Sequence, residues 1–185
     1  MRTSLGIVVP EAPLERTETG MRPAGEGWFV LNARDACWYD GELGAYTPFA
    51  REDARFEQVG FNLVILRPGE PNGMYHGEDV EEDFLVLAGE CLLLVEDEER
   101  RLRAWDFVHC PPWTEHIIFV GAGSEPCLIA MVSARRKEDG IRYPVNELAK
   151  ARGASVEKET MVPSDAYARF PEDRPVRCPP GFPGE

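Results

Sequence analysis

Short runs of β-forming residues, each bounded by turn residues, most constrain the fold of this 185-residue chain. They begin at Trp28 and recur as far as Val132, and no long helical periodicity interrupts them. Many short strands at regular spacing are typical of an all-β sandwich or barrel. The expected strands are Trp28–Leu31, Ala36–Asp40, Val59–Leu66, Phe84–Leu87, Cys91–Val95, Arg101–Arg103, Phe107–Cys110, Ile117–Val120 and Leu128–Val132.

The composition changes on either side of this region and divides the chain into three parts. Residues 1–27 contain three prolines and several glycines without periodicity, which predicts an extended N-terminal arm. Residues 28–134 are the expected β-barrel. Residues 135–185 are a C-terminal extension that ends in a stretch with five prolines after position 170, and this stretch is expected to be extended.

Two short helices are expected within the C-terminal extension. Pro144 precedes Val145–Arg152, and Gly153 is suited to end that helix as a C-cap. Ser164 is a suitable N-cap for a second helix over Asp165–Phe170. These helices are additions to a β domain and leave the all-β fold class unchanged.

The charge balance limits the classes of partner. Asp and Glu number 33 against 20 Lys and Arg, a formal net charge of −13. Binding to nucleic acids or anionic membranes depends on Lys and Arg, so both are disfavoured. The sequence has no apolar run near the roughly 20 residues that a membrane span needs. The apolar stretch Leu5–Val9 is too short for a signal-peptide core, so a cytoplasmic location is expected.

Two stretches concentrate the residues that carry chemistry. In the first, His76 and Glu78 are two apart, so in a strand both point to the same face. Glu82 opens the next apolar run and shares the parity of its core positions. A carboxylate that points inward is costly unless it is paired or binds a metal. In the second stretch, a proline pair ends one strand and His116 begins the next, which places an imidazole at a barrel mouth.

These stretches resemble the two sequence motifs of the cupin superfamily. His76, Glu78, Glu82 and Gly89 follow the order of the first motif, and Asp106, Pro111 and His116 match the second. The likeness covers about residues 57–132. Glu78 stands where the first motif has its second His, and Gly69 lies one place earlier than the leading Gly. Trp105 and Trp113 replace glycines of the second motif, and Val120 replaces its usual Asn.

The resemblance implies a small double-stranded β-helix, the RmlC-like jelly-roll barrel of cupins, with one metal site. His76, Glu82 and His116 are the implied ligands, with Glu78 as a possible fourth. Two imidazoles with one or two carboxylates suit a single divalent transition metal, either Fe, Mn, Ni or Zn. The alternative is that the histidines and Glu82 are hydrogen-bonded core residues. Glu78 also belongs to an acidic cluster of the kind that is usually a solvated loop.

Three further residues near the motifs have plainer expectations. His109 lies outside the motif positions and is expected in the core or beside the ligands. Cys110, one of five cysteines without CxxC spacing, is expected to be a buried thiol. Trp113 precedes His116 on a loop, where it either narrows the pocket mouth or packs as an ordinary loop residue.

Two classes of function agree with these observations. The first is a metal-dependent enzyme that acts on a small polar molecule, with a dioxygenase-like oxidoreductase favoured over an isomerase by analogy with the fold. The second is a non-catalytic binder or sensor of a small ligand, with or without metal. A homodimer is also expected, because Trp28, Phe29, Trp38 and Tyr39 lie outside both motifs and aromatic residues are enriched in interface cores.

Overall fold

The computed structural model describes residues 8–51, 55–121, 125–135, 140–180 and 182. Its helices and strands are β1 (Leu14–Arg16), β2 (Met21–Pro23), β3 (Trp38–Gly41), β4 (Gly44–Thr47), β5 (Val59–Leu66), β6 (Gly77–Glu78), β7 (Glu82–Ala88), β8 (Glu90–Val95), β9 (Glu98–Arg103), β10 (Phe107–Cys110), β11 (His116–Phe119), β12 (Cys127–Ala134), β13 (Ile141–Arg142), α1 (Glu147–Lys150), α2 (Pro163–Ala166) and β14 (Arg174–Val176). Among the described residues, no helix is long and apolar enough to cross a membrane.

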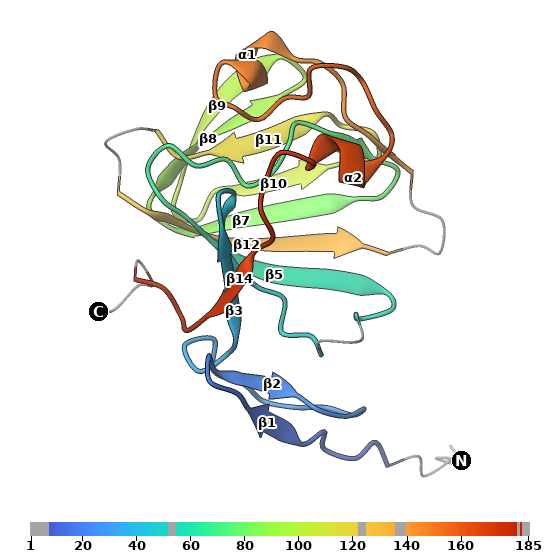
Figure 1. The fold of residues 1–185 in the computed structure, drawn as a ribbon, viewed down its shortest axis with the longest axis vertical. Coiled ribbons are helices and arrows are strands. Elements are labelled where there is room, and N and C mark those ends of the chain that lie inside the picture. The colour runs from blue at the N-terminus through green and yellow to red at the C-terminus, as the bar shows by residue number, and fades with distance from the viewer. Residues whose placement is uncertain (1–7, 52–54, 122–124, 136–139, 181, 183–185) are drawn as a thin grey trace, which may run out of the picture.

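Two facing antiparallel sheets make the barrel, as Figure 1 shows. The larger sheet has seven strands in the order β10-β7-β12-β5-β4-β3-β14, and the smaller has the order β11-β8-β9. Long crossovers between neighbouring strands, such as β5 to β12, are characteristic of a jelly roll rather than a meander. The expected all-β double-stranded barrel is therefore confirmed.

The main core lies between the two sheets and follows the two-residue alternation of strands. Even-numbered positions of β5 and β7 point inward, including Val64 and Phe84, and Ile129 of β12 meets them. From the smaller sheet, Leu93 and Ile118 close the other side of the same cluster. This parity determines which polar residues at the strand ends also face the interior.

The outer face of the large sheet carries a second core. Trp38 is fully buried there with Ile65 and Leu128, whereas Tyr39, on the opposite face of β3, stacks on Tyr46 with ring centroids 5.5 Å apart. These two aromatic side chains therefore pack on their own barrel. Trp28, by contrast, is half exposed and forms only an isolated bridge with the N-terminal arm. The strand expected at Trp28–Leu31 is absent from the described structure.

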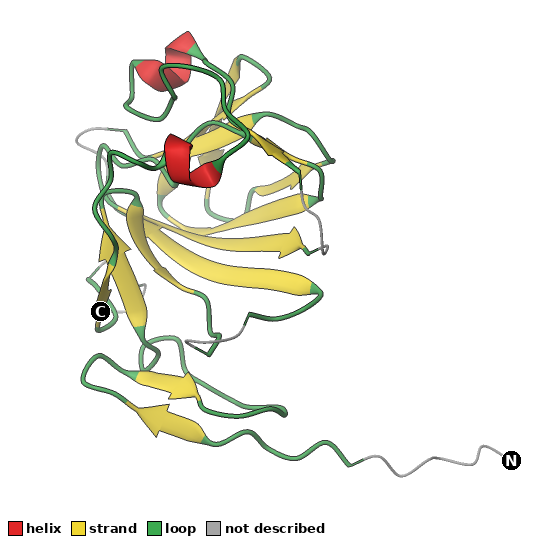
Figure 2. Cartoon of the chain, turned by 45° about the vertical axis from the view of Figure 1, so that its right-hand side comes forward, coloured by secondary structure: helices red, strands yellow, loops and turns green. Residues whose placement is uncertain are grey.

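The N-terminal arm contains a hairpin that sequence patterning did not indicate. Strands β1 and β2 pair only with each other over three residue pairs, and Figure 2 shows this hairpin at the end of the molecule opposite the helices. A backbone hydrogen bond of 3.0 Å from Cys37 N to Met21 O ties the hairpin to the segment before β3. A second hydrogen bond, of 3.3 Å from Arg177 Nε to the carbonyl of Glu18, links the same hairpin to the end of β14.

The C-terminal extension returns to the barrel at two places. Strand β14 pairs with β3, so the proline-rich tail adds an edge strand where an extended chain was expected. Strand β13 pairs with β6 beside His76, and the segment with α1 and α2 lies over that end of the barrel (Figure 1). Both helices are only four residues long, and α2 begins at Pro163, with Val162 rather than Ser164 at the N-cap.

Candidate metal centre

His76 and His116 face each other across an isolated antiparallel bridge. The backbone N–H of His116 donates to the carbonyl of His76 at 2.9 Å, and the reverse hydrogen bond measures 3.3 Å. The two ring centroids lie 5.0 Å apart. Because paired residues on adjacent strands point to the same face, this bridge alone brings both imidazoles to one place inside the barrel.

The same local contact fixes both imidazole rings. Nδ1 of His76 lies 2.7 Å from the carbonyl oxygen of Met74, and Nδ1 of His116 lies 2.9 Å from that of Thr114. A carbonyl only accepts a hydrogen bond, so each Nδ1 carries the proton and each Nε2 keeps its lone pair. Metal-binding histidines are typically held in this way, with the second ring nitrogen bonded to a carbonyl or carboxylate.

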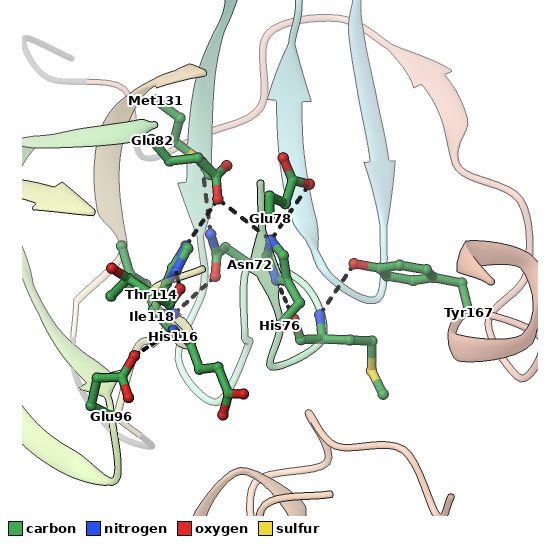
Figure 3. Close-up of polar contacts among 12 residues, drawn as sticks. Asn72, His76, Glu78, Glu82, Glu96, Thr114, His116, Ile118, Met131 and Tyr167 are labelled. Atoms are coloured by element: carbon green, nitrogen blue, oxygen red, sulfur yellow. Dashed lines mark hydrogen bonds and ion pairs between the residues drawn. The ribbon is translucent and has the colours of Figure 1, made fainter. Parts of the chain in front are cut away.

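Glu82 supplies a carboxylate to the same place from the first residue of β7. It pairs with Ser133 of β12 and with Cys110 of β10, and its parity matches the inward-facing Phe84. Its Oε2 lies 3.6 Å from Nε2 of His76 and 3.4 Å from Nε2 of His116, and its side chain is only 12% exposed. Figure 3 shows the carboxylate directed at both rings.

The separations within this triad suit a shared ion better than direct hydrogen bonds. Hydrogen bonds from nitrogen to oxygen usually measure about 2.7–3.2 Å. Two atoms that each lie about 2.0–2.2 Å from one metal ion are about 3–4 Å apart. The separations of 3.6 Å and 3.4 Å between Glu82 Oε2 and the two Nε2 atoms fall in this range, and all three candidate ligand atoms lie within 4.8 Å of one another. The residues present therefore fit one transition metal.

The electrostatics of the three side chains follow from burial and from one another. Burial opposes the charged form of His76, but the Glu82 and Glu78 carboxylates outweigh it and raise the pKa of His76. Burial and the charge of His76 lower the pKa of His116, which is 2% exposed. Burial alone would raise the pKa of Glu82, but the two imidazoles lower it, so this carboxyl stays ionised.

Glu78 approaches this triad from one side. Its Oε1 lies 3.8 Å from Nε2 of His76, and its side chain is 26% exposed. Among the described residues, the compact cluster of candidate ligands contains His76, Glu82 and His116 without Glu78. The structure thus brings three of the four expected ligands together and leaves Glu78 beside them, at the more open side.

His109 and Trp113, which the sequence also singled out, lie outside the cluster of candidate ligands. His109 was expected in the core or beside the ligands, but its side chain is 49% exposed and pairs with Asp83 at 2.7 Å. The reason is strand parity, since its neighbour Cys110 points into the core and is buried. Trp113 is half exposed, and its ring edge lies next to Gly140 at the start of the C-terminal extension.

Three residues that sequence reasoning missed surround the site. Asn72 accepts a hydrogen bond from the backbone N–H of Ile118 at 2.9 Å and so fixes the strand that begins with His116. The buried ring of Tyr143 lies 5.8 Å from that of His76. The hydroxyl of Tyr167 accepts a hydrogen bond from the N–H of Met74. Both tyrosines come from the extension, and no motif or periodicity there indicated this role.

Comparisons with known proteins agree with this geometry. Residues 62–133 match the family model described as a cupin domain. The polyketide cyclase RemF from Streptomyces resistomycificus aligns with 14% identity over 60% of this chain and 82% of that chain, with a TM-score of 0.51. No curated protein matches the sequence.

Two further solved structures align over smaller parts of the chain. One is a sugar phosphate isomerase of the cupin superfamily from Silicibacter pomeroyi, with 22% identity, a TM-score of 0.44, and coverage of 46% of this chain and 56% of that chain. The other is an RmlC-like cupin with a double-stranded β-helix from Methanocaldococcus jannaschii, with 20% identity, a TM-score of 0.40, and coverage of 52% and 79%. A likeness to solved structures at these identities shows a similar fold and says nothing of a shared activity. Residues 62–133 of this chain therefore carry a cupin domain, and they lie within the barrel described above.

Proposed function

We propose that this protein is a metal-dependent enzyme that acts on a small polar molecule, and that its chemistry is that of a dioxygenase-like oxidoreductase. The observation that supports this most directly is the triad of His76, Glu82 and His116, in which both imidazoles present Nε2 to one point. Two histidines and one carboxylate with open positions are typical of non-haem iron oxygenases. Glu78 is proposed as a fourth, exchangeable ligand on the open side.

The protein's own residues supply orientation and a dry environment. The carbonyls of Met74 and Thr114 hold the two imidazoles in one tautomer, so neither ring has to reorganise when it binds a metal. The ring of Phe84, 5.1 Å from that of His116, and the buried Tyr143 limit the access of water. When bound, a transition metal here supplies Lewis acidity and, for iron, redox chemistry.

A non-catalytic ligand binder is the second candidate, and one observation favours it. Glu78 stands where the cupin motif has its second histidine. Among the described residues, the cluster of candidate metal ligands has three members, without Glu78. With fewer strong ligands, a site holds its metal less firmly and is suited to sensing as well as to turnover. The ligand in this case is again a small polar molecule.

Oxygen uptake by the protein loaded with Fe(II) tests the proposed reaction. The substrates are a panel of small hydroxy acids, keto acids and sugar phosphates, and products are identified by mass spectrometry. Uptake that requires Fe(II) and is lost in His116→Ala but kept in His109→Ala supports the oxidoreductase. Isomerised product without oxygen uptake supports an isomerase instead, and a compound that binds but is recovered unchanged supports the binder.

We also propose that the protein is a homodimer. Three of the four aromatic residues behind this expectation no longer support it, because Trp38 and Tyr39 pack on their own barrel and Phe29 stacks on Phe56. The remaining support comes from exposed apolar side chains around the N-terminal hairpin, namely Val8, Val9, Trp28 and Val30. Exposed apolar side chains that gather on one surface often mark an interaction site.

A further inference from the structure

Arg135 extends the inner face of the barrel beyond the end of β12. The backbone N–H of Arg135 donates to the carbonyl of Gln58 at 2.9 Å, and that of Ala134 donates to the carbonyl of Glu81 at 3.0 Å. Hydrogen bonding to both neighbouring strands therefore continues to this point. Since Ile129 faces the core, alternation places Ser133 and then Arg135 on the same inward face.

A glycine on the neighbouring strand makes room for the Arg135 side chain. A Cβ at Gly60 would lie 2.8 Å from Oγ of Ser133, 2.9 Å from Nη2 of Arg135 and 3.2 Å from its Nε. Gly60 has the parity of the inward-facing Val64, so this space belongs to the barrel interior. The guanidinium therefore lies over position 60, in a space that any larger residue there would fill.

The guanidinium and the candidate metal centre share one face of one sheet. Ser133 pairs with Glu82 on one side and with Gly60 on the other, so these three residues form a row across β7, β12 and β5. Strands in a sheet are about 4.8 Å apart, which puts the Cα atoms of Glu82 and Gly60 about 10 Å apart. A small molecule of several carbon atoms spans this interval.

Arg135 has donor capacity that the described residues do not use. Its Nε is buried and has no hydrogen-bond partner among them. A buried polar group without a partner is costly, and a guanidinium presents a planar fork of N–H donors that matches a carboxylate or a phosphate. The nearby Glu81 and Glu82 would repel an anion, so an anion at this end of the barrel requires a cation beside it.

We propose that Arg135 binds the carboxylate or phosphate group of a small anionic ligand whose other end reaches the triad of His76, Glu82 and His116. The contact of the ligand with the triad rests on the proposed metal centre, whereas the contact with Arg135 does not. The ligand is then a small molecule with an anionic group at one end and oxygen donors at the other. Ser133, beside the guanidinium, adds a hydroxyl to the same subsite.

Isothermal titration calorimetry of the full-length protein tests this subsite. The probes are glutarate for a carboxylate and inorganic phosphate for a phosphate, each with and without Mn(II). Arg135→Gln should raise the Kd of the preferred anion about tenfold or more, which is the effect of losing a hydrogen bond to a charged group. Gly60→Ala should also raise this Kd, because the added Cβ displaces the guanidinium. Arg103→Gln is the control, since Arg103 is exposed on β9 and its loss changes the net charge equally.

The outcomes separate this inference from the proposed metal centre. Arg135-dependent binding of either probe supports the subsite and identifies the anion. If that binding remains while the protein takes up no Mn(II), the subsite stands and the metal centre is wrong. The subsite is rejected if neither probe binds the wild type, if Arg135→Gln and Gly60→Ala bind as tightly as the wild type, or if Arg103→Gln weakens binding equally.

Discussion

His76 and His116 are held by the same contact, from Nδ1 to the carbonyl two residues earlier in the chain. This contact is local, so the orientation of each ring depends on the residues next to it in the chain. Glu82 is different, because its position depends on the pairing of β7 with β10 and β12. Short-range contacts therefore set the orientation of the two imidazoles, and strand pairing sets the positions of all three candidate ligands.

Replacing one imidazole should remove the metal and the stability that it provides. For His116→Ala we expect loss of bound metal and, if the wild type is saturated about a hundredfold above its Kd, a loss of about 3 kcal/mol. That corresponds to a fall in Tm of about 6–12 °C for a chain of this size. Elemental analysis and thermal unfolding of the same samples measure both effects.

His109→Ala is the matched control for this substitution. Its side chain is half exposed and paired only with Asp83, and exposed ion pairs contribute about 0–1 kcal/mol. Metal content should be unchanged and Tm should move little. Equal loss of metal from His109→Ala and His116→Ala would contradict the assignment of the site.

At the scale of elements, helix α1 depends on one side chain at its N-terminus. Oδ1 of Asn146 accepts a hydrogen bond from the N–H of Ala149 at 3.0 Å, and its Nδ2 donates to Asp97 at 2.5 Å. Asn146→Ala should lower the free energy of unfolding by about 1–2 kcal/mol. Ser164→Ala should change it by less than about 0.5 kcal/mol, because Ser164 is exposed within α2 and is not its N-cap. Urea unfolding measures the free energy of unfolding of both variants. An equal loss from Asn146→Ala and Ser164→Ala would mean that Ser164 also has a capping role.

The sequence predicted the barrel elements well where apolar alternation was strong. Strand β5 was expected at Val59–Leu66 and β10 at Phe107–Cys110, and both have these bounds. Strand β4 was missed because Gly44 and Ala45 are weak β-formers, and its partners across the sheet hold it in place. The hairpin of β1 and β2 was missed for a similar reason, since its residues show no alternation.

The candidate site could be predicted only in part from the sequence. The motif spacing indicated His76, Glu82 and His116, and the structure brings their ligand atoms together. Tyr143 and Tyr167 could not be predicted, because their place beside the site depends on how the C-terminal extension folds back. Such contacts between distant segments leave no periodic signal in the chain.

At the scale of the whole molecule, the C-terminal extension completes the barrel at both of its contacts. Strand β14 pairs with β3 and covers that edge of the large sheet, and a covered edge is protected from pairing with other chains. At the end of the barrel that carries the triad of His76, Glu82 and His116, β13 and Tyr143 close one side of the site. The extension therefore contributes both to the sheet and to the surroundings of the triad.

The proposed homodimer makes a prediction at the same scale. Light scattering coupled to size exclusion at micromolar concentration should give a mass of about twice the 20.8 kDa of one chain. Deleting residues 1–30 removes Val8, Val9, Trp28 and Val30 and should lower the mass to that of a monomer. A mass near 20.8 kDa for the full-length protein would rule out the dimer.

The metal content of the purified protein tests the proposed centre most directly. Inductively coupled plasma mass spectrometry of protein made without a histidine tag should find about one transition-metal ion per chain, lost from His76→Ala and His116→Ala. The control His109→Ala should keep the metal. Absence of metal from the wild type, both as purified and after incubation with Fe(II), Mn(II), Ni(II) and Zn(II), would contradict a metal centre at His76, Glu82 and His116.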